Sequence, residues 1–246
     1  MTGRLIALEG PDGVGKTALA QRLAQVTYED AMAGLDSGVT AMPGDAPLVF
    51  TSKRQVSRTS GYAAGLMEHL ATMLWHSGDA PDLPDAFWAG LQAAWFIAHS
   101  TAVVQPLLDA GYDVLVDGWV YKFCSKLLVQ GWAQPDLDVI FARVRRPDAV
   151  ILLTASSAAL YARRQDFRPA ELGMHAGYDE LNEESFVHYQ EAGLQRLHAM
   201  ADAGGWPVVR LDPGEPPSAS AARIAPVLAT VRARAAEPGA SQRVAP

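Results

Sequence analysis

Cysteine and positive charge are scarce in this sequence. Its 246 residues include a single cysteine, Cys124, which excludes an intrachain disulfide and gives no sign of oxidative export. Acidic residues outnumber basic ones, so the formal net charge at pH 7 is −7. An acidic chain of this kind argues against a nucleic-acid-binding surface. We therefore expect a cytoplasmic protein whose partners include no nucleic acid.

Long apolar runs and metal-ligand patterns are also missing. The most apolar region, 87–108, is interrupted by Gln92, His99, Ser100 and Gln105. Such a segment is typical of a buried helix and not of a membrane span. The six histidines show no metal-ligand spacing, and the one thiol has no second thiol to work with. The sequence therefore predicts no membrane partner and no metal centre built from histidine or cysteine.

A complete phosphate-binding loop stands at residues 10–17, directly after the short apolar segment 5–8. It reads Gly-Pro-Asp-Gly-Val-Gly-Lys-Thr and fits the pattern G-x-x-x-x-G-K-[ST]. In this pattern backbone N–H groups surround the phosphates, the lysine neutralises the terminal phosphate oxygens, and the last hydroxyl joins the Mg²⁺ shell. We therefore predict that the chain binds a nucleoside triphosphate with Mg²⁺. The predicted nucleotide contacts are Gly10, Asp12, Gly13, Gly15, Lys16 and Thr17, of which Thr17 is also a metal ligand.

Strands and helices alternate along the rest of the chain. Continuous apolar strands such as 113–117 and 149–153 suit a parallel sheet that is buried on both faces. The pattern predicts a three-layer α/β fold of the P-loop NTPase type with a parallel five-stranded sheet, in one domain over 1–235, and a disordered tail at 236–246. The predicted strands are 4–8, 48–52, 113–117, 149–153 and 207–211, and the predicted helices are 16–33, 61–77, 85–110, 119–130, 135–145, 156–166, 182–203 and 219–234.

An acidic residue, Asp117, ends the third predicted strand. The carboxyl end of a central parallel strand is where ligands bind in such sheets, beside the phosphate loop. An aspartate there can hold a water of the Mg²⁺ shell or orient the acceptor hydroxyl. We predict that Asp117 is a metal ligand and a catalytic residue. The alternative is a strand-ending aspartate that caps the following helix.

A basic cluster follows the fourth predicted strand and contains Arg163, Arg164 and Arg168. We predict that the segment 163–180 is a lid. An arginine-bearing lid stabilises charge on the transferring phosphoryl group and excludes water. Arginine suits this task because its planar fork can bridge two phosphate oxygens. The alternative is a charged, solvated helix end.

In order and content these motifs resemble the thymidylate-kinase-like family of nucleoside monophosphate kinases. The resemblance runs from Leu5 to about Val231. Residues 6–17 are similar to the opening motif of that family, and residues 147–153 followed by Arg163-Arg164 are similar to its later strand and lid. The resemblance implies transfer of the γ-phosphoryl group of ATP-Mg²⁺ to a small-molecule acceptor by a homodimer. The phosphate loop has no arginine, and in this family such a loop usually goes with catalytic arginines in the lid, so the resemblance favours catalytic roles for Arg163, Arg164 and Arg168 beside those predicted for Lys16 and Asp117.

The chain departs from the family where the acceptor binds. The family has an Asp-Arg pair where this chain reads Asp117-Gly118. In an ungapped alignment, Gln92 and Phe96 stand where the family has an aromatic residue that stacks on the thymine and, four residues later, an arginine that binds the acceptor. A phosphate dianion in a cleft needs charged partners, so the loss of two arginines favours a less negative, planar or apolar acceptor. We therefore expect an acceptor other than ordinary dTMP.

Several residues could take over the acceptor site. Lys122 and Lys126 share one helical face just past Asp117, although two such lysines can also be plain solvated surface. Lys53 and the nearby Arg58 follow the second predicted strand, where the family has a loop that contacts the acceptor. The predicted acceptor contacts are Arg58, Gln92, Phe96, Trp119 and Lys122.

Two readings stay open beside a changed acceptor. One is a genuine dTMP kinase with a rebuilt pocket. The other is a non-catalytic homologue that binds nucleotide. A P-loop ATPase that drives motion would need a switch region, and the sequence offers none.

Overall fold

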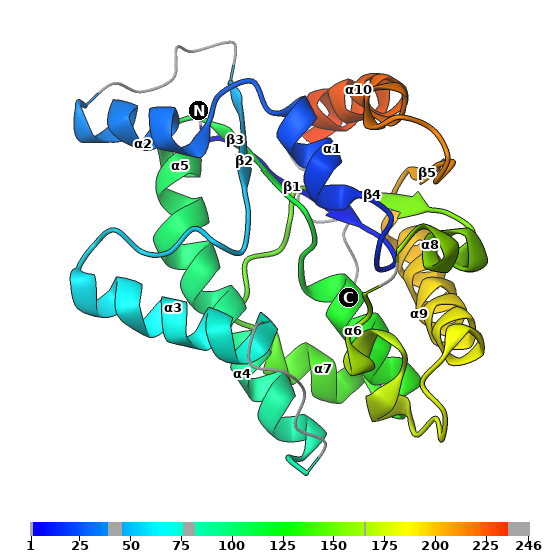
Figure 1. Ribbon diagram of the computed structural model, residues 1–246. Coiled ribbons are helices and arrows are strands. Elements are labelled where there is room, and N and C mark those ends of the chain that lie inside the picture. The colour runs from blue at the N-terminus through cyan, green and yellow to red at the C-terminus, as the bar shows by residue number, and fades with distance from the viewer. Residues whose placement is uncertain (1, 39–45, 76–81, 165, 236–246) are drawn as a thin grey trace.

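The computed structural model describes residues 2–38, 46–75, 82–164 and 166–235 (Figure 1). Its centre is a parallel sheet of five strands in the order β2-β3-β1-β4-β5. The strands are β1 (Leu5–Glu9), β2 (Leu48–Thr51), β3 (Asp113–Val116), β4 (Ala149–Thr154) and β5 (Val208–Arg210). The predicted α/β fold with a five-stranded parallel sheet is therefore confirmed.

Helices cover both faces of the sheet and make three layers (Figure 1). Successive residues of β1 point to opposite faces, so Leu5 and Ala7 belong to one apolar cluster and Ile6 and Leu8 to the other. The helices are α1 (Lys16–Leu23), α2 (Tyr28–Asp36), α3 (Gly61–Trp75), α4 (Asp85–His99), α5 (Gln105–Asp109), α6 (Val120–Val129), α7 (Gln134–Ile140), α8 (Ser157–Arg163), α9 (Glu183–Gly204) and α10 (Pro217–Ala235).

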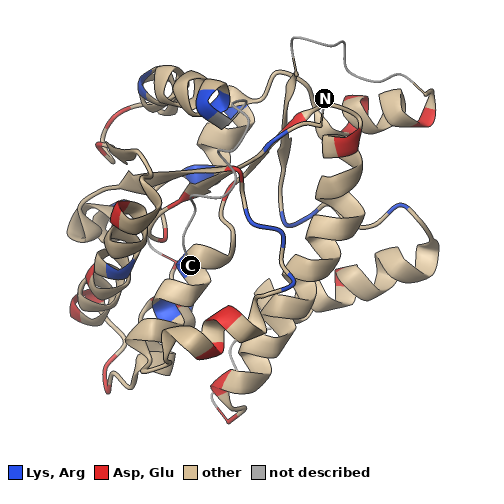
Figure 2. Ribbon diagram, turned by 180° about the vertical axis from the view of Figure 1, so that it is seen from behind, with Lys and Arg blue, Asp and Glu red and all other residues tan. Residues whose placement is uncertain are grey.

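The strand register decides where the loops meet. In the sheet β1 lies between β3 and β4, and Ala7 pairs with Val116. The phosphate loop that follows β1 and the Asp117 segment that follows β3 therefore leave the sheet at the same edge. The strands carry charge only at their ends, at Glu9, Asp113 and Arg210, and the other charges lie on helices and loops (Figure 2).

The predicted helix 16–33 is wrong, because the structure has two helices there. After α1 ends at Leu23, the N–H groups of Gln25 and Val26 both donate to the carbonyl oxygen of Leu48, which attaches this segment to the edge of the sheet. The hydroxyl of Thr27 then accepts from the N–H of Asp30 and caps α2. Apolar spacing continues across the break, which is why the sequence pattern missed it.

Other boundaries differ less. The predicted helix 85–110 is divided into α4, a π-helical turn (Ser100–Val104) and α5, whose first turn contains Pro106. The predicted helix 135–145 ends earlier, at Ile140. The segment 163–180, predicted to be a lid, contains two short 3₁₀ turns, Pro169–Glu171 and Met174–Ala176. The end of the predicted helix 61–77 and the tail 236–246 lie outside the described residues.

Across the described ranges, no helix combines the length and the apolar character that a membrane crossing requires.

Candidate active site

The phosphate loop makes the turn from β1 to α1. Gly10 and Gly15 have positive φ angles of 146° and 95°, and a Cβ at Gly10 would lie 2.3 Å from the carbonyl oxygen of Leu153. Glycine is therefore required at Gly10 by both conformation and space. The ammonium group of Lys16 lies over the loop and donates to the carbonyl oxygens of Gly10 and Pro11 at 2.8 Å each. The ammonium group of Lys16 and the backbone N–H groups at the start of α1 therefore lie together at the loop, where both can bind an anion.

Thr17 and Asp117 meet at the start of α1. The hydroxyl of Thr17 donates to the Asp117 carboxylate, although the two residues are 100 positions apart in the chain. Asp117 does not cap the following helix, because the N-cap of α6 is Trp119 and no side chain caps it. The described residues hold no cluster of three His, Cys, Asp or Glu that could bind a metal alone. A hydroxyl beside a carboxylate is the oxygen pair that fits Mg²⁺ when phosphate oxygens complete the shell.

A cavity of about 340 Å³ opens beside this loop. All four lysines of the chain line it, and so do Arg168 and His175 of the predicted lid segment. Its lysines are Lys16, Lys53, Lys122 and Lys126, its carboxylates are Asp12, Asp85, Asp117 and Glu171, and its aromatic residues are Trp75, Trp88, Phe96, Trp119, Phe123 and Tyr189. The cavity therefore joins the phosphate loop to a cationic and aromatic chamber.

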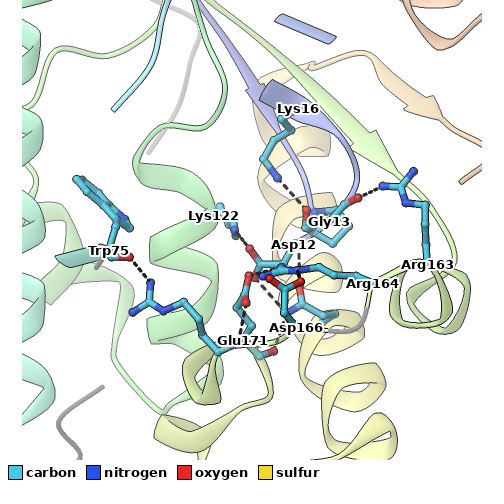
Figure 3. A network of polar contacts seen from close by, with 12 residues as sticks. Asp12, Gly13, Lys16, Trp75, Lys122, Arg163, Arg164, Asp166 and Glu171 are labelled. Atoms are coloured by element: carbon cyan, nitrogen blue, oxygen red, sulfur yellow. Dashed lines mark hydrogen bonds and ion pairs between the residues drawn. The ribbon is translucent and has the colours of Figure 1, made fainter. Parts of the chain in front are cut away.

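Asp12 ties the phosphate loop to α6. Its carboxylate accepts from the ammonium group of Lys122 (Figure 3). It also accepts from the ammonium group of Lys126, at 2.8 Å. The two lysine side chains are only 24% and 18% exposed, so they are not solvated surface. Burial acts to raise the pKa of Asp12, but the charges of Lys122 and Lys126 outweigh burial and hold that pKa well below its usual value. Asp12 is thus a fixed anion between two fixed cations.

Two other lysines of the cavity have lowered pKa values. Burial, together with the charge of Lys122, lowers the pKa of Lys16 to about 7 and that of Lys53 to about 8. The ammonium group of Lys53 lies 4.7 Å from the ring centroid of Trp75, in a cation–π contact. Like charges held in a partly dry cavity repel one another, and a bound anion relieves that repulsion.

Glu9 is a site residue that the sequence analysis did not select. It is fully buried at the end of β1, and its carboxylate accepts from the backbone N–H groups of Trp119 at 2.8 Å and Lys122 at 3.3 Å. Burial raises its pKa, and these two hydrogen bonds and the nearby lysines act against that rise. Glu9 thereby holds the first turn of α6 beside the phosphate loop. The available signal was a charged residue at the end of an otherwise apolar strand.

The predicted acceptor residues divide into two groups. Gln92, Phe96, Trp119 and Lys122 line the cavity, with Phe96 and Trp119 in edge-to-face contact at 5.2 Å between ring centroids. Arg58 does not line it, because its guanidinium pairs with Asp36 of α2 at the surface, at 2.7 Å.

Gly118, the position at which the sequence resemblance predicts a missing arginine, has a backbone φ of 130°. A Cβ there would lie 3.9 Å from Cε of Lys16, so the position faces the phosphate loop. Because L side chains rarely adopt this φ, the missing arginine cannot be restored without strain.

The three predicted lid arginines lie in three places. Arg163 donates to the carbonyl oxygen of Gly13 (Figure 3). It also donates to that of Pro213 and lines a second cavity, of about 230 Å³, between α1, α8 and residues 211–220. Arg164 pairs with Glu171 at 2.8 Å. Arg168 alone lines the large cavity, where it also donates to the carbonyl oxygen of Trp75 at 3.4 Å.

Comparison with known proteins gives a structural match only. No protein-family model and no curated protein matches the sequence. The thymidylate kinase of Ehrlichia chaffeensis matches with a TM-score of 0.58 and 15% identity, over 93% of this chain and 100% of that one. The thymidylate kinase of Candida albicans, an enzyme of broad substrate specificity, matches with a TM-score of 0.57 and 15% identity, over 93% and 92%. The chain therefore has a thymidylate-kinase-like fold.

Proposed function

We propose that this chain is a kinase that transfers the γ-phosphoryl group of ATP to a small acceptor bound in the lysine-lined cavity. The observation that carries the proposal is continuity between the phosphate loop and that cavity. Lys16, Asp117 and Asp12 belong to the loop region and also line the cavity. A triphosphate held by the loop would therefore lie next to a molecule in the chamber, and phosphoryl transfer requires that the two reactants be held together in this way.

The nucleotide side of the site supports this assignment. The second cavity adjoins the loop at Val14 and Gly15 and has the place and size for a nucleoside, with Arg163 at its wall. Thr17 and Asp117 would hold Mg²⁺, which when bound neutralises charge on the phosphates. Lys16 would move from the loop carbonyls to the phosphate oxygens. No strong general base is needed, because this chemistry depends on positioning and charge stabilisation.

On the acceptor side, we propose an anionic, nucleotide-like or other small molecule that differs from ordinary dTMP. The expectation of a weakly charged acceptor does not fit the lysines, because Lys53, Lys122 and Lys126 supply the cations that two missing arginines do not. The difference from dTMP is supported by Gln92, Phe96 and Gly118 at three acceptor positions of the resembled family. The same lysines favour the second candidate, a dTMP kinase with a rebuilt phosphate site.

The test is ADP release from ATP-Mg²⁺ across an acceptor panel. The panel contains dTMP, dUMP, other nucleoside monophosphates, free nucleosides, and hydroxylated metabolites with a phosphate or carboxylate. Lys16→Ala is the blank, and Arg22→Ala is the matched control, because Arg22 is an exposed cation on the same helix.

Each outcome of the panel decides between the candidates. Turnover with an acceptor other than dTMP supports the proposal, and strong turnover with dTMP supports the second candidate. Tight ATP binding without turnover of any acceptor would mean that the chain is a non-catalytic nucleotide-binding homologue. The homodimer that the resemblance implies is a separate proposal, which light scattering on the purified protein tests directly.

A further inference from the structure

Gln190 is a buried amide with all of its polar atoms in use. It lies on α9 and is only 4% exposed. Its side-chain oxygen accepts from the backbone N–H of Asp12 at 3.1 Å. Its side-chain nitrogen donates to the Asp12 carboxylate at 3.2 Å and to the backbone carbonyl oxygen of Glu171 at 3.0 Å. One amide thus bonds to the phosphate loop twice and to the lid once.

At the lid, Glu171 accepts hydrogen bonds from two arginines. The carboxylate of Glu171 accepts from the side chain of Arg164 at 2.8 Å (Figure 3). It also accepts from the backbone N–H of Arg168 at 2.9 Å. Arg168 is the lid arginine that lines the large cavity. The backbone of Arg168 is therefore held in place by the carboxylate of Glu171. The backbone carbonyl of Glu171 is in turn held by the side chain of Gln190.

We propose that Gln190 is a positioning residue that fixes the lid to the phosphate loop, so that Arg168 is held over the cavity. The lid also has apolar anchors, because Phe167 and Leu172 pack against the core. Apolar contacts resist separation but do not fix direction, whereas hydrogen bonds fix both distance and angle. The placement of Arg168 for catalysis rests on the proposed kinase function; the anchoring of the lid does not.

The chemistry of the contact requires an amide. Asp12 offers a donor on its backbone and an acceptor on its side chain, and Glu171 offers a second acceptor, so the partner must accept once and donate twice. Glutamine does this, methionine does not, and an ionised glutamate would set a second carboxylate against that of Asp12.

The first experiment is hydrogen exchange of the lid in Gln190→Met and in the matched control Gln195→Met, an exposed residue of the same helix. The reporters are amides that bond only within the folded lid, such as those of Glu171 and Ala176. We expect exchange about 5- to 10-fold faster in Gln190→Met, from the loss of a buried hydrogen bond, with no change in the control. Wild-type exchange in both variants would overturn the proposal. Because no acceptor is needed, this result is independent of the kinase assignment.

A second variant, Gln190→Glu, keeps the experiment decisive if Gln190→Met does not fold. We expect its lid to exchange faster where the new carboxyl is ionised and to regain part of its protection where that carboxyl is protonated and can donate once, after correction for intrinsic exchange. Exchange that is equal to wild type at every pH would overturn the proposal. Exchange that is uniformly faster at every pH would also overturn it, since loose packing alone would then explain the change.

Steady-state kinetics test the consequence for catalysis. With the acceptor that the panel identifies, we expect Gln190→Met to lower kcat about 10-fold or more, the scale of a misplaced charge-stabilising group, while KM for ATP changes less than about 2-fold. A rise in KM for ATP at constant kcat would contradict this role.

Discussion

Lys53 shows how one residue can define the acceptor site. It is partly buried beside Trp75, and burial with the charge of Lys122 lowers its pKa to about 8. It is therefore protonated below about pH 8 and neutral above that value. An anionic acceptor that depends on this charge binds best on the acidic side of the transition.

We predict that Lys53→Met raises KM for the acceptor about 10- to 100-fold, which corresponds to roughly 1.5–3 kcal/mol for a charge-assisted hydrogen bond, and leaves KM for ATP nearly unchanged. In the wild type, KM for the acceptor should rise as the pH increases through 8. Lys53→Arg is the control, because it keeps its charge above pH 8. An acceptor KM that is the same in all three proteins would rule out this role.

His99 gives a pH dependence to stability. It is buried against Trp95 and Trp119, and burial lowers its pKa to about 4. In the unfolded chain its pKa returns to about 6.5, so between these values the unfolded state binds more protons. The contribution of His99 to the free energy of unfolding is therefore fully present above about pH 6.5 and is lost as the pH falls to 4.

We predict that protonation linked to His99 lowers the free energy of unfolding by up to about 3 kcal/mol as the pH falls across that interval. In His99→Gln the dependence of Tm on pH should therefore be flatter. Thermal unfolding between pH 4 and 7.5 measures it. The control is His69→Gln, since His69 is exposed on α3. A wild-type slope in His99→Gln would show that other groups cause the acid sensitivity.

Gly118 sets a limit on engineering the site toward dTMP. Because its φ is 130°, any L side chain there is strained by roughly 1–3 kcal/mol. We predict that Gly118→Ala lowers Tm. We also predict that Gly118→Arg alone does not raise dTMP turnover, because the new side chain is strained at this φ. The control is Gly90→Ala in α4, where an added Cβ meets nothing within 4 Å and should stabilise slightly. Gly118→Ala with the Tm of the wild type would contradict this argument.

At the level of elements, local periodicity predicted helices and strands well and their interruptions poorly. Every predicted strand is present, because a strand of a parallel sheet reads as a continuous apolar run. The break between α1 and α2 was not predicted, because it depends on a bridge from Val26 to Val49, a residue of another element. A hydrogen bond between distant segments leaves no periodic signal.

We predict that Thr27→Ala destabilises the protein by about 1 kcal/mol, the usual effect of losing an N-cap. Denaturant unfolding measures this change. Thr72→Ala near the end of α3 is the control, since the hydroxyl of Thr72 donates to the helix carbonyl of Glu68 one turn back and caps no helix start. Equal effects at the two positions would mean that Thr27 is not a cap.

At the level of the whole molecule, the sequence located the nucleotide half of the candidate site and only part of the acceptor half. The phosphate loop is one short segment and is recognised from its sequence alone. Asp117 was predicted to lie beside it because ligands bind at the carboxyl ends of parallel strands, and Thr17 of the loop does contact Asp117. Lys53 belongs to a loop after β2, and its approach to Lys122 of α6 depends on strand order and on helix rotation. Neither can be read from spacing along the chain, and the same holds for Gln190, which is 178 positions from Asp12.

The gathering of all four lysines in one cavity makes chemical modification of lysine a probe of that cavity. Since every lysine of the chain lines one cavity, a reagent specific for side-chain amines has no lysine to modify elsewhere. Acetylation or reductive methylation, which also modify the terminal α-amine, would report cavity access at the four lysines, and a bound ligand would appear as their protection in a mass spectrum. Amine coupling through lysine to a sensor surface would block the cavity, so any such assay of this protein needs a different point of attachment.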